Sequence, residues 1–273
     1  ILSGNGYLPE RMYEGDGSYP SSYAYDHSLS HSHVIMDGTY GWPSGYGIVN
    51  WEGHGSQAGA YRKVWMDNGN GIPESGEMWS PAFISSSDTS LLDDDKPAIV
   101  FSPSCVNGCP ENPANLGKSL LQQGAAAIVA STSTSWYVRG WDDKNDGGNT
   151  SVDYYFFHYL INEEQKCGNA LYNSQARNKD YLSWSNWTFW QNMFDFCLYG
   201  EPSLGTASVY VSIDAPDEVP EGGDFVARVD VTEVTDFDSC QFHVTYDPTV
   251  IEVTDVTAGM IASTSISIDL WRF

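Results

Sequence analysis

Three short, mainly apolar stretches, each bounded by Gly or Pro, restrict this chain most. They cover residues 47–51, 97–102 and 125–131. A strand with one buried face alternates apolar and polar residues, whereas a strand buried on both faces is apolar almost throughout. These stretches therefore predict strands covered by helices on both sides, which is an α/β architecture.

Helical patterns lie between and after these stretches. One covers residues 115–124 and ends at Gly124, where a helix commonly terminates in a left-handed residue. Because it joins the second and third apolar stretches, those two strands should be parallel. Residues 151–162 and 169–180 predict two further helices, and residues 184–199 fit either a helix or a strand. The pattern indicates an α/β sandwich with a mainly parallel sheet.

The two ends of the chain differ from this middle part. Residues 1–47 are rich in Gly, Ser, Tyr and His and predict loops with short strands or a helix. Beyond Gly205 the apolar residues alternate around 209–213, 225–231 and 242–246, which predicts an antiparallel β-sandwich. We expect two domains, residues 1–205 and a truncated second domain at 206–273. We also expect the ends to be fragment boundaries, with a signal peptide lost.

The charge excludes one class of partner. The chain has 12 Lys and Arg against 36 Asp and Glu, a net charge of −24. Contacts with phosphate backbones need clustered cations, so we expect no nucleic-acid partner. No apolar run approaches the roughly 20 residues that span a bilayer, so we expect no membrane span. An exported protein, a salt-adapted protein and a calcium-binding protein all fit such an acidic composition.

Two predicted strands lead to a reactive side chain at their carboxyl ends, where α/β sheets place their sites. The first leads to His54, which lies between two glycines, and the second to Cys105. A His about 50 residues ahead of a nucleophilic Cys is the spacing of caspase-like enzymes. The N–H groups of Gly55 and Cys105 could form an oxyanion hole. The alternative is a buried structural Cys and an ordinary turn.

Four motifs in order carry a family resemblance. They are NWEGHGS around His54, SCVNG around Cys105, ASTSTSW ending at Trp136, and YGEPSL at residues 199–204. Over about residues 46–205 the chain resembles the gingipain family of cysteine peptidases. The resemblance implies a caspase-haemoglobinase-like α/β fold and a Cys–His dyad that hydrolyses peptide bonds through a thioester. It implies no cofactor for the chemistry.

The same resemblance assigns roles to residues. Cys105 matches the nucleophile, His54 the general acid/base and Gly55 a donor to the oxyanion, with Cys105 N–H as the second donor. Trp136 matches a residue lining the pocket for the side chain before the scissile bond.

Some residues depart from the family pattern or are not located by it. Cys109 is not part of the motif and could be a disulfide partner, a redox brake on Cys105 or filler. The acidic residue that selects Lys or Arg in well-known members would lie upstream of the His, where Asp16, Asp26 and Asp37 are candidates.

Two further constellations suggest metals. Residues 66–77 are close to a calcium loop, with Asn68, Asn70 and Glu77 at ligand positions 3, 5 and 12, although Met66 occupies position 1. A polar Asn-Gly turn is the alternative. The histidines His27, His31 and His33 are close in sequence, but their spacing is a weak pattern for a metal site.

The acidic C-terminal region resembles the first half of a cohesin-like β-sandwich. Residues 207–273 carry 13 acidic residues against Arg228 and Arg272. Cohesin domains bind dockerin modules, so the resemblance implies a dockerin-like partner, and a plain spacer is the alternative. Our interpretation is a secreted or cell-surface cysteine endopeptidase acting on protein or peptide substrates. Two rivals are a catalytically silent scaffold in a binding or adhesion protein, and a thiol hydrolase of other esters or amides.

Overall fold

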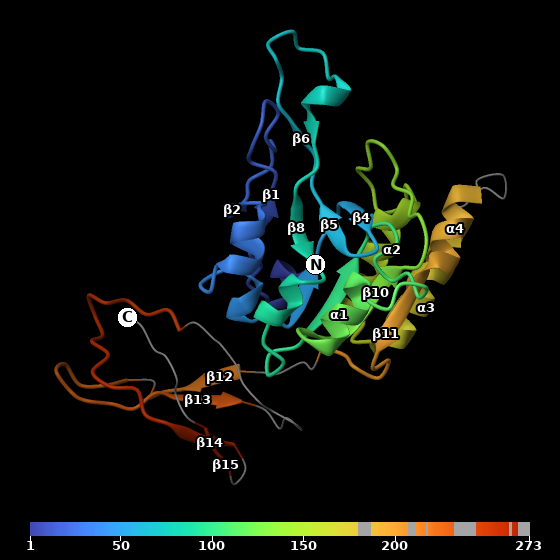
Figure 1. The fold of residues 1–273 in the computed structure, drawn as a ribbon. Helices are drawn as coiled ribbons and strands as arrows, with labels where there is room; N and C mark the ends of the chain where they lie inside the picture. Colours follow the sequence, from blue (N-terminus) through green and yellow to red (C-terminus); the bar gives the residue numbers. More distant parts are fainter. Residues whose placement is uncertain (180–186, 207–210, 217, 232–243, 262–263, 267–273) are drawn as a thin grey trace. The chain divides into compact units, whose positions relative to one another are not determined.

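The computed structural model describes residues 1–179, 187–206, 211–216, 218–231, 244–261 and 264–266 (Figure 1). The chain divides into two compact units, residues 1–206 and 207–273. Each unit is described by itself below. Within the described residues, no helix has the length and apolar character needed to cross a membrane.

The first unit is built around a four-stranded sheet. Its order is β11 (Phe196–Gly200), β10 (Ala125–Ser131), β9 (Ala98–Ser102) and β3 (Ile48–Asn50). The three predicted strands β3, β9 and β10 are parallel to one another, and β11 runs antiparallel to β10. The mainly parallel sheet is therefore confirmed. The ambiguous stretch 184–199 contributes both a helix, α4 (Trp187–Asp195), and the strand β11.

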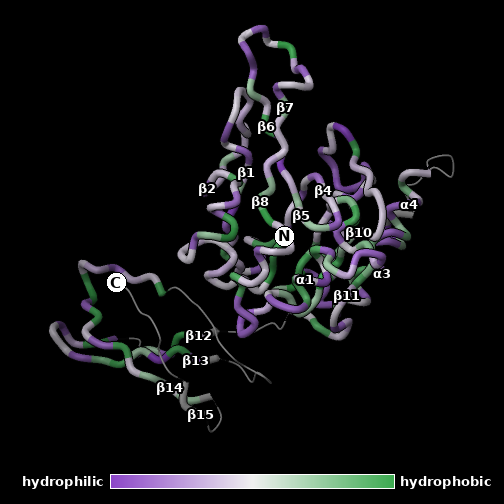
Figure 2. Tube along the Cα trace, in the orientation of Figure 1, coloured by the Kyte–Doolittle hydropathy of each residue, from purple (hydrophilic) through white to green (hydrophobic). Residues whose placement is uncertain are grey.

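Alternate residues of β9 enter two separate cores. Ala98 and Val100 pack on one face with Leu116 and Leu120 of helix α1 (Leu116–Gln122). On the other face, Ile99 and Phe101 belong to a core shared with three helical segments: α2 (Gly148–Phe157), η6 (His158–Asn162) and α3 (Cys167–Lys179). The sheet is thus buried on both faces, as its apolar sequence predicts. In Figure 2 hydrophobic colouring runs along α1 and β10.

Both ends of α1 carry residues typical of helix termini. Asn115 caps the start of the helix by accepting a hydrogen bond from Lys118 N–H at 2.8 Å. Gly124 follows the helix with φ of 102°, a conformation that favours glycine.

Short elements complete the first unit. Strands β4 (His54–Ser56), β5 (Gly59–Tyr61) and β8 (Ala82–Ser85) form an antiparallel sheet, and β6 (Val64–Trp65) with β7 (Met78–Trp79) forms a hairpin that projects in Figure 1. The N-terminal part holds β1 (Met12–Tyr13) and β2 (His27–Ser28), which matches the predicted loops with short strands. The remaining turns are η1 (Ser3–Asn5), η2 (Ser32–Met36), η3 (Trp42–Ser44), η4 (Ser75–Glu77) and η5 (Asp88–Leu91).

In the second unit the described strands form two antiparallel pairs. One joins β12 (Val211–Asp214) to β13 (Arg228–Val231), and the other joins β14 (Gly259–Ile261) to β15 (Thr264–Ile266). These pairs agree with antiparallel β-structure in this region. The third predicted stretch, 242–246, begins outside the described residues, and its described part, 244–246, is not a strand.

Candidate active site

The carboxyl ends of β3 and β9 bring the two predicted reactive segments together. Asn50, the last residue of β3, pairs with Phe101 of β9, and the chain continues from there to His54 and Cys105 respectively. Gly55, directly after His54, lies against the backbone of Cys105. A Cβ added to Gly55 would lie 2.7 Å from Cys105 N and would also clash with Cys105 O. Only glycine permits this approach.

Among the described residues, the backbone around Cys105 leaves one N–H without a hydrogen-bond acceptor. Ser104 N–H donates to Ser102 O at 2.8 Å, and Val106 N–H donates to Ser133 O at 2.8 Å. Toward the described residues, Cys105 N–H donates no hydrogen bond. Val106 has a φ of 52°, which is uncommon for a β-branched residue and turns the chain sharply after the thiol. The Cys105 N–H next to Gly55 is therefore not used by the described part of the protein itself.

A buried asparagine fastens the Cys105 loop to the sheet that carries His54. Asn107 Nδ2 donates to Ser56 O at 2.6 Å and to Gly59 O at 3.0 Å. Its Oδ1 accepts from Ser102 Oγ at 2.8 Å. Because the Asn107 side chain makes all three of these hydrogen bonds in the protein interior, it fixes how β4 and the loop after β9 approach each other.

The thiol itself contacts the loop after β10. Cys105 Sγ lies 3.6 Å from Ser135 O and 3.9 Å from Ser135 Oγ. The imidazole of His54 is exposed and makes no hydrogen bond to this thiol, both residues being among those described. Catalytic hydrogen bonds are often open before substrate binds, so this geometry is compatible with a dyad but does not form one.

The four described cysteines differ in their surroundings. Cys105, Cys109, Cys167 and Cys197 are all free, and Cys240 lies outside the described residues. Burial raises the pKa of the Cys167 thiol to about 11 and also raises the pKa of Cys197. Cys109 is buried, with its sulfur 3.0 Å from Glu111 Oε2 and 3.2 Å from Gln57 Nε2. Of the alternatives for Cys109, these contacts favour a packing role.

Trp136 follows Ser135 in the chain and lies at the same edge of the sheet. Its ring is 36% exposed and meets Trp187 edge to face at 5.6 Å between centroids. Its indole N–H donates to Gln191 Oε1 at 3.0 Å. Its backbone is held by Asn192 of α4, which accepts from Trp136 N at 2.8 Å and donates to Trp136 O at 2.6 Å. The structure therefore gives Trp136 a fixed, partly exposed ring near the thiol.

Sequence reasoning missed Ser135 in the loop after β10 and Asn149 of α2, which supports that loop. Asn149 Nδ2 donates to Pro103 O at 3.1 Å and to Ser135 Oγ at 3.3 Å, and Asn149 N–H donates to Trp136 O at 2.9 Å. Ser135 and Asn149 are buried, with 7% and 4% exposure. A polar residue at the start of a helix usually indicates a cap, so nothing in the sequence pointed from Asn149 to the thiol.

A buried carboxyl group also lies near this edge. Asp153 of α2 is 8% exposed and accepts one hydrogen bond, from Asn50 Nδ2 at 2.9 Å. Its other oxygen has no partner among the described residues. Burial raises the pKa of Asp153 well above its ordinary value, the Asn50 hydrogen bond opposes this, and the charge of Glu52 adds to it.

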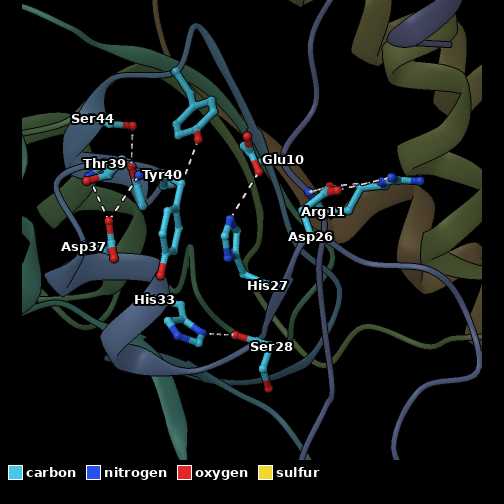
Figure 3. A network of polar contacts seen from close by, with 12 residues as sticks. Glu10, Arg11, Asp26, His27, Ser28, His33, Asp37, Thr39, Tyr40 and Ser44 are labelled. Atoms are coloured by element: carbon cyan, nitrogen blue, oxygen red, sulfur yellow. Dashed lines mark hydrogen bonds and ion pairs between the residues drawn. The ribbon is translucent and has the colours of Figure 1, made fainter.

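The three upstream candidates for selecting a basic substrate have other partners. Asp16 pairs with Arg62 at 2.7 Å and Asp26 with Arg11 at 3.1 Å. Asp37 accepts backbone N–H bonds from Thr39 and Tyr40, as Figure 3 shows. Asp26 and Asp37 therefore serve the N-terminal region itself, and Asp16 joins that region to Arg62.

The three histidines of this region are held by contacts within the protein, and His27 and His33 both contact the Tyr40 ring. His27 stacks on Tyr40 at 3.5 Å, His33 Nδ1 lies 2.5 Å from Ser28 O, and His31 pairs with Asp88 at 3.1 Å (Figure 3 shows the first two residues). Within the described ranges, no group of three His, Cys, Asp or Glu side chains could hold a metal ion. The structure gives no support to a histidine metal site.

The calcium-like loop is closed by its own hydrogen bonds. Glu77 accepts from Asn68 N–H and from the Trp65 indole, both at 2.9 Å, and the Trp65 bond is the main cause of a lowered pKa for Glu77. Asn68 Oδ1 and Asn70 Oδ1 each accept a backbone N–H. Carboxylate and amide oxygens have further lone pairs, so Asn68, Asn70 and Glu77 keep the capacity to bind a cation.

Comparison with known proteins agrees with the motifs. The family model described as Peptidase family C25 matches residues 4–207, and the model of the cohesin domain matches residues 209–269. A search of curated proteins found no relative of this chain.

One solved structure, titled "Structure of Protease", is similar at 12% identity and a TM-score of 0.42. The similarity covers 66% of this chain and 40% of that protein, so the chain spans well under two-thirds of its length. The match to the family model covers well over half of the chain, which therefore belongs to Peptidase family C25, the gingipain family of cysteine peptidases.

Proposed function

We propose that the first unit is a cysteine endopeptidase in which Cys105 is the nucleophile and His54 the general acid/base. The observation that carries the proposal is the contact of Gly55 with the Cys105 backbone, beside a Cys105 N–H that is free of described partners. This contact places the residue after His54 against the reactive loop. A dyad with an adjacent oxyanion donor is the arrangement needed for acyl transfer.

The mechanism follows from these groups. His54 takes the proton of the Cys105 thiol, and the thiolate attacks the carbonyl carbon of the scissile peptide bond. The N–H groups of Gly55 and Cys105 stabilise the negative oxygen of the tetrahedral intermediate. The C–N bond breaks, the amine leaves with the proton from His54, and a thioester remains. Water, deprotonated by His54, hydrolyses the thioester and restores the thiol.

We further propose that the first unit has a caspase-haemoglobinase-like fold. Trp136 lines the pocket for the substrate side chain before the scissile bond. The cohesin domain binds a dockerin-like partner, and the protein works outside the cell or at its surface. The partner could be tested by titrating a calcium-loaded dockerin module into the full chain; no heat of binding would count against it.

The deciding experiment is hydrolysis of a fluorogenic peptide library that varies the residue before the cleaved bond. Wild type, Cys105→Ala, His54→Ala and Cys109→Ala would be compared under reducing conditions. We expect turnover in wild type and Cys109→Ala and a loss of about 10³-fold or more in the two dyad variants. Unchanged hydrolysis in His54→Ala would refute the dyad.

Two outcomes would favour the rivals. Absence of turnover together with a Cys105 that resists an alkylating probe would indicate a silent scaffold. Cys105-dependent hydrolysis of esters or simple amides, without cleavage of peptides, would indicate another thiol hydrolase.

A further inference from the structure

Ser135, in the loop after β10, connects helix α2 to the Cys105 thiol. Asn149 Nδ2 lies 3.3 Å from Ser135 Oγ, and Ser135 Oγ lies 3.9 Å from Cys105 Sγ. Asn149 and Ser135 are almost fully buried. The arrangement is separate from the His54 segment, which reaches Cys105 through Gly55.

The hydrogen-bond partners determine where the Ser135 proton points. The Pro103 carbonyl can only accept, so the Asn149 atom 3.1 Å from it must be the amide nitrogen. That nitrogen also faces Ser135 Oγ, which therefore acts as the acceptor. The hydroxyl proton of Ser135 needs another acceptor, and in the described part of the chain the remaining polar neighbour of Ser135 Oγ is Cys105 Sγ.

We propose that Ser135 donates a hydrogen bond to the Cys105 thiolate and that Asn149 is the positioning residue that orients the hydroxyl. In the neutral thiol, the S–H proton points to Ser135 O at 3.6 Å. A carbonyl oxygen cannot donate a hydrogen bond to a thiolate. Once His54 has taken the proton, the sulfur instead accepts the Ser135 O–H. This inference rests on the proposed function and adds to it a donor that stabilises the nucleophile.

The loop that holds Ser135 is fixed at several points. Asn192 brackets Trp136 through its backbone N–H and carbonyl, and Ser133 O accepts Val106 N–H from the other side of Cys105. A donor that is held in place loses little entropy when it meets the thiolate, and a hydrogen bond to a charged group is stronger than one between neutral groups.

The pH profile of Cys105 alkylation tests this inference without any peptide substrate. Iodoacetamide labelling would be followed at the Cys105 peptide by mass spectrometry. Wild type would be compared with Ser135→Ala, Ser135→Thr and Asn149→Asp, and Ser133→Ala would be the matched control from the same loop. Titratable groups on the neighbouring segments include His54, Glu52 and Asp153, and none of them is changed.

Ser135→Ala should move the midpoint of labelling upward by about 1–2 pH units, the size expected for one hydrogen bond to a charged group. Asn149→Asp should move it in the same direction, because its carboxylate would accept the Ser135 proton and because its negative charge disfavours the nearby thiolate. Ser135→Thr keeps the hydroxyl and should restore the wild-type midpoint. Ser133→Ala should leave it unchanged.

A wild-type midpoint in Ser135→Ala, or an equal shift in Ser133→Ala, would overturn the inference. If Ser135→Ala does not fold, Asn149→Ala takes its place, because it removes the orienting amide without adding a charge, and a wild-type midpoint there would overturn the inference. Because labelling needs no catalysis, failure of the peptidase proposal and failure of this inference give different results.

Discussion

Gly55 is the residue whose lack of a side chain matters most for the proposed chemistry. In Gly55→Ala the new Cβ would meet both the N and O atoms of Cys105, so the loop must shift. We expect a loss of about 100-fold or more in kcat/KM, because small displacements of reacting groups are costly. Gly47→Ala is the control, since a Cβ there meets nothing within 4 Å. Equal activity in the two variants would contradict the assigned role of Gly55.

The raised pKa of Asp153 predicts how the stability of the protein depends on pH. Its pKa is raised in the folded protein from an ordinary value near 3.8, so its favourable contribution holds at acidic pH and is lost as pH rises. Replacing it in Asp153→Asn removes the ionisation. The melting temperature of the variant relative to wild type should therefore increase from about pH 4 toward neutrality. Circular dichroism melts at several pH values would measure it, and a difference independent of pH would contradict the buried charge.

At the scale of elements, strand β9 carries both cores of the first unit. Phe101 is fully buried and packs 5.1 Å from Phe156 and 5.4 Å from Phe196, between ring centroids. Phe101→Ala should lower the free energy of unfolding by about 3–5 kcal/mol, measured by urea denaturation. Leu91 is half exposed, and Leu91→Ala should cost under about 1 kcal/mol. Similar costs for both would argue against this core.

The loop between β6 and β7 contains the predicted calcium site. If Asn68, Asn70 and Glu77 bind Ca²⁺, the melting temperature should rise with calcium and fall with a chelator, because binding to the folded state stabilises it. Glu77→Gln should abolish the calcium response. An unchanged midpoint with chelator in wild type would count against a site in this loop.

The sheet and its helices could be predicted because burial on both faces leaves a direct mark on the sequence. β9 and β10 are apolar up to a final serine, and α1 ends where Gly124 predicts. The region after residue 184 could not be resolved, since α4 and β11 follow one another without a break in composition. The Asn149–Ser135 contact could not be predicted either, because it depends on a polar pair brought together by packing.

At the scale of the whole molecule, the chain consists of two compact units. A chain that ends at residue 206 contains the complete set of contacts around Cys105 described above. We expect it to fold, to show a cooperative thermal transition and to label at Cys105 as the full chain does. Loss of the transition in the shorter chain would show that the first unit depends on residues 207–273.

The double burial of β9 also has a consequence for how the molecule opens. Every residue of β9 is buried, and its central residues 99–101 pair with strands on both edges. His54 instead belongs to a strand of three residues in a small separate sheet. Amide hydrogen exchange should therefore be slowest in β9 and appreciably faster in β4, since local opening exposes the less supported segment first. The segment bearing the proposed base would open while the strand leading to the thiol stays closed, so brief excursions of the native state would separate the two without unfolding the core.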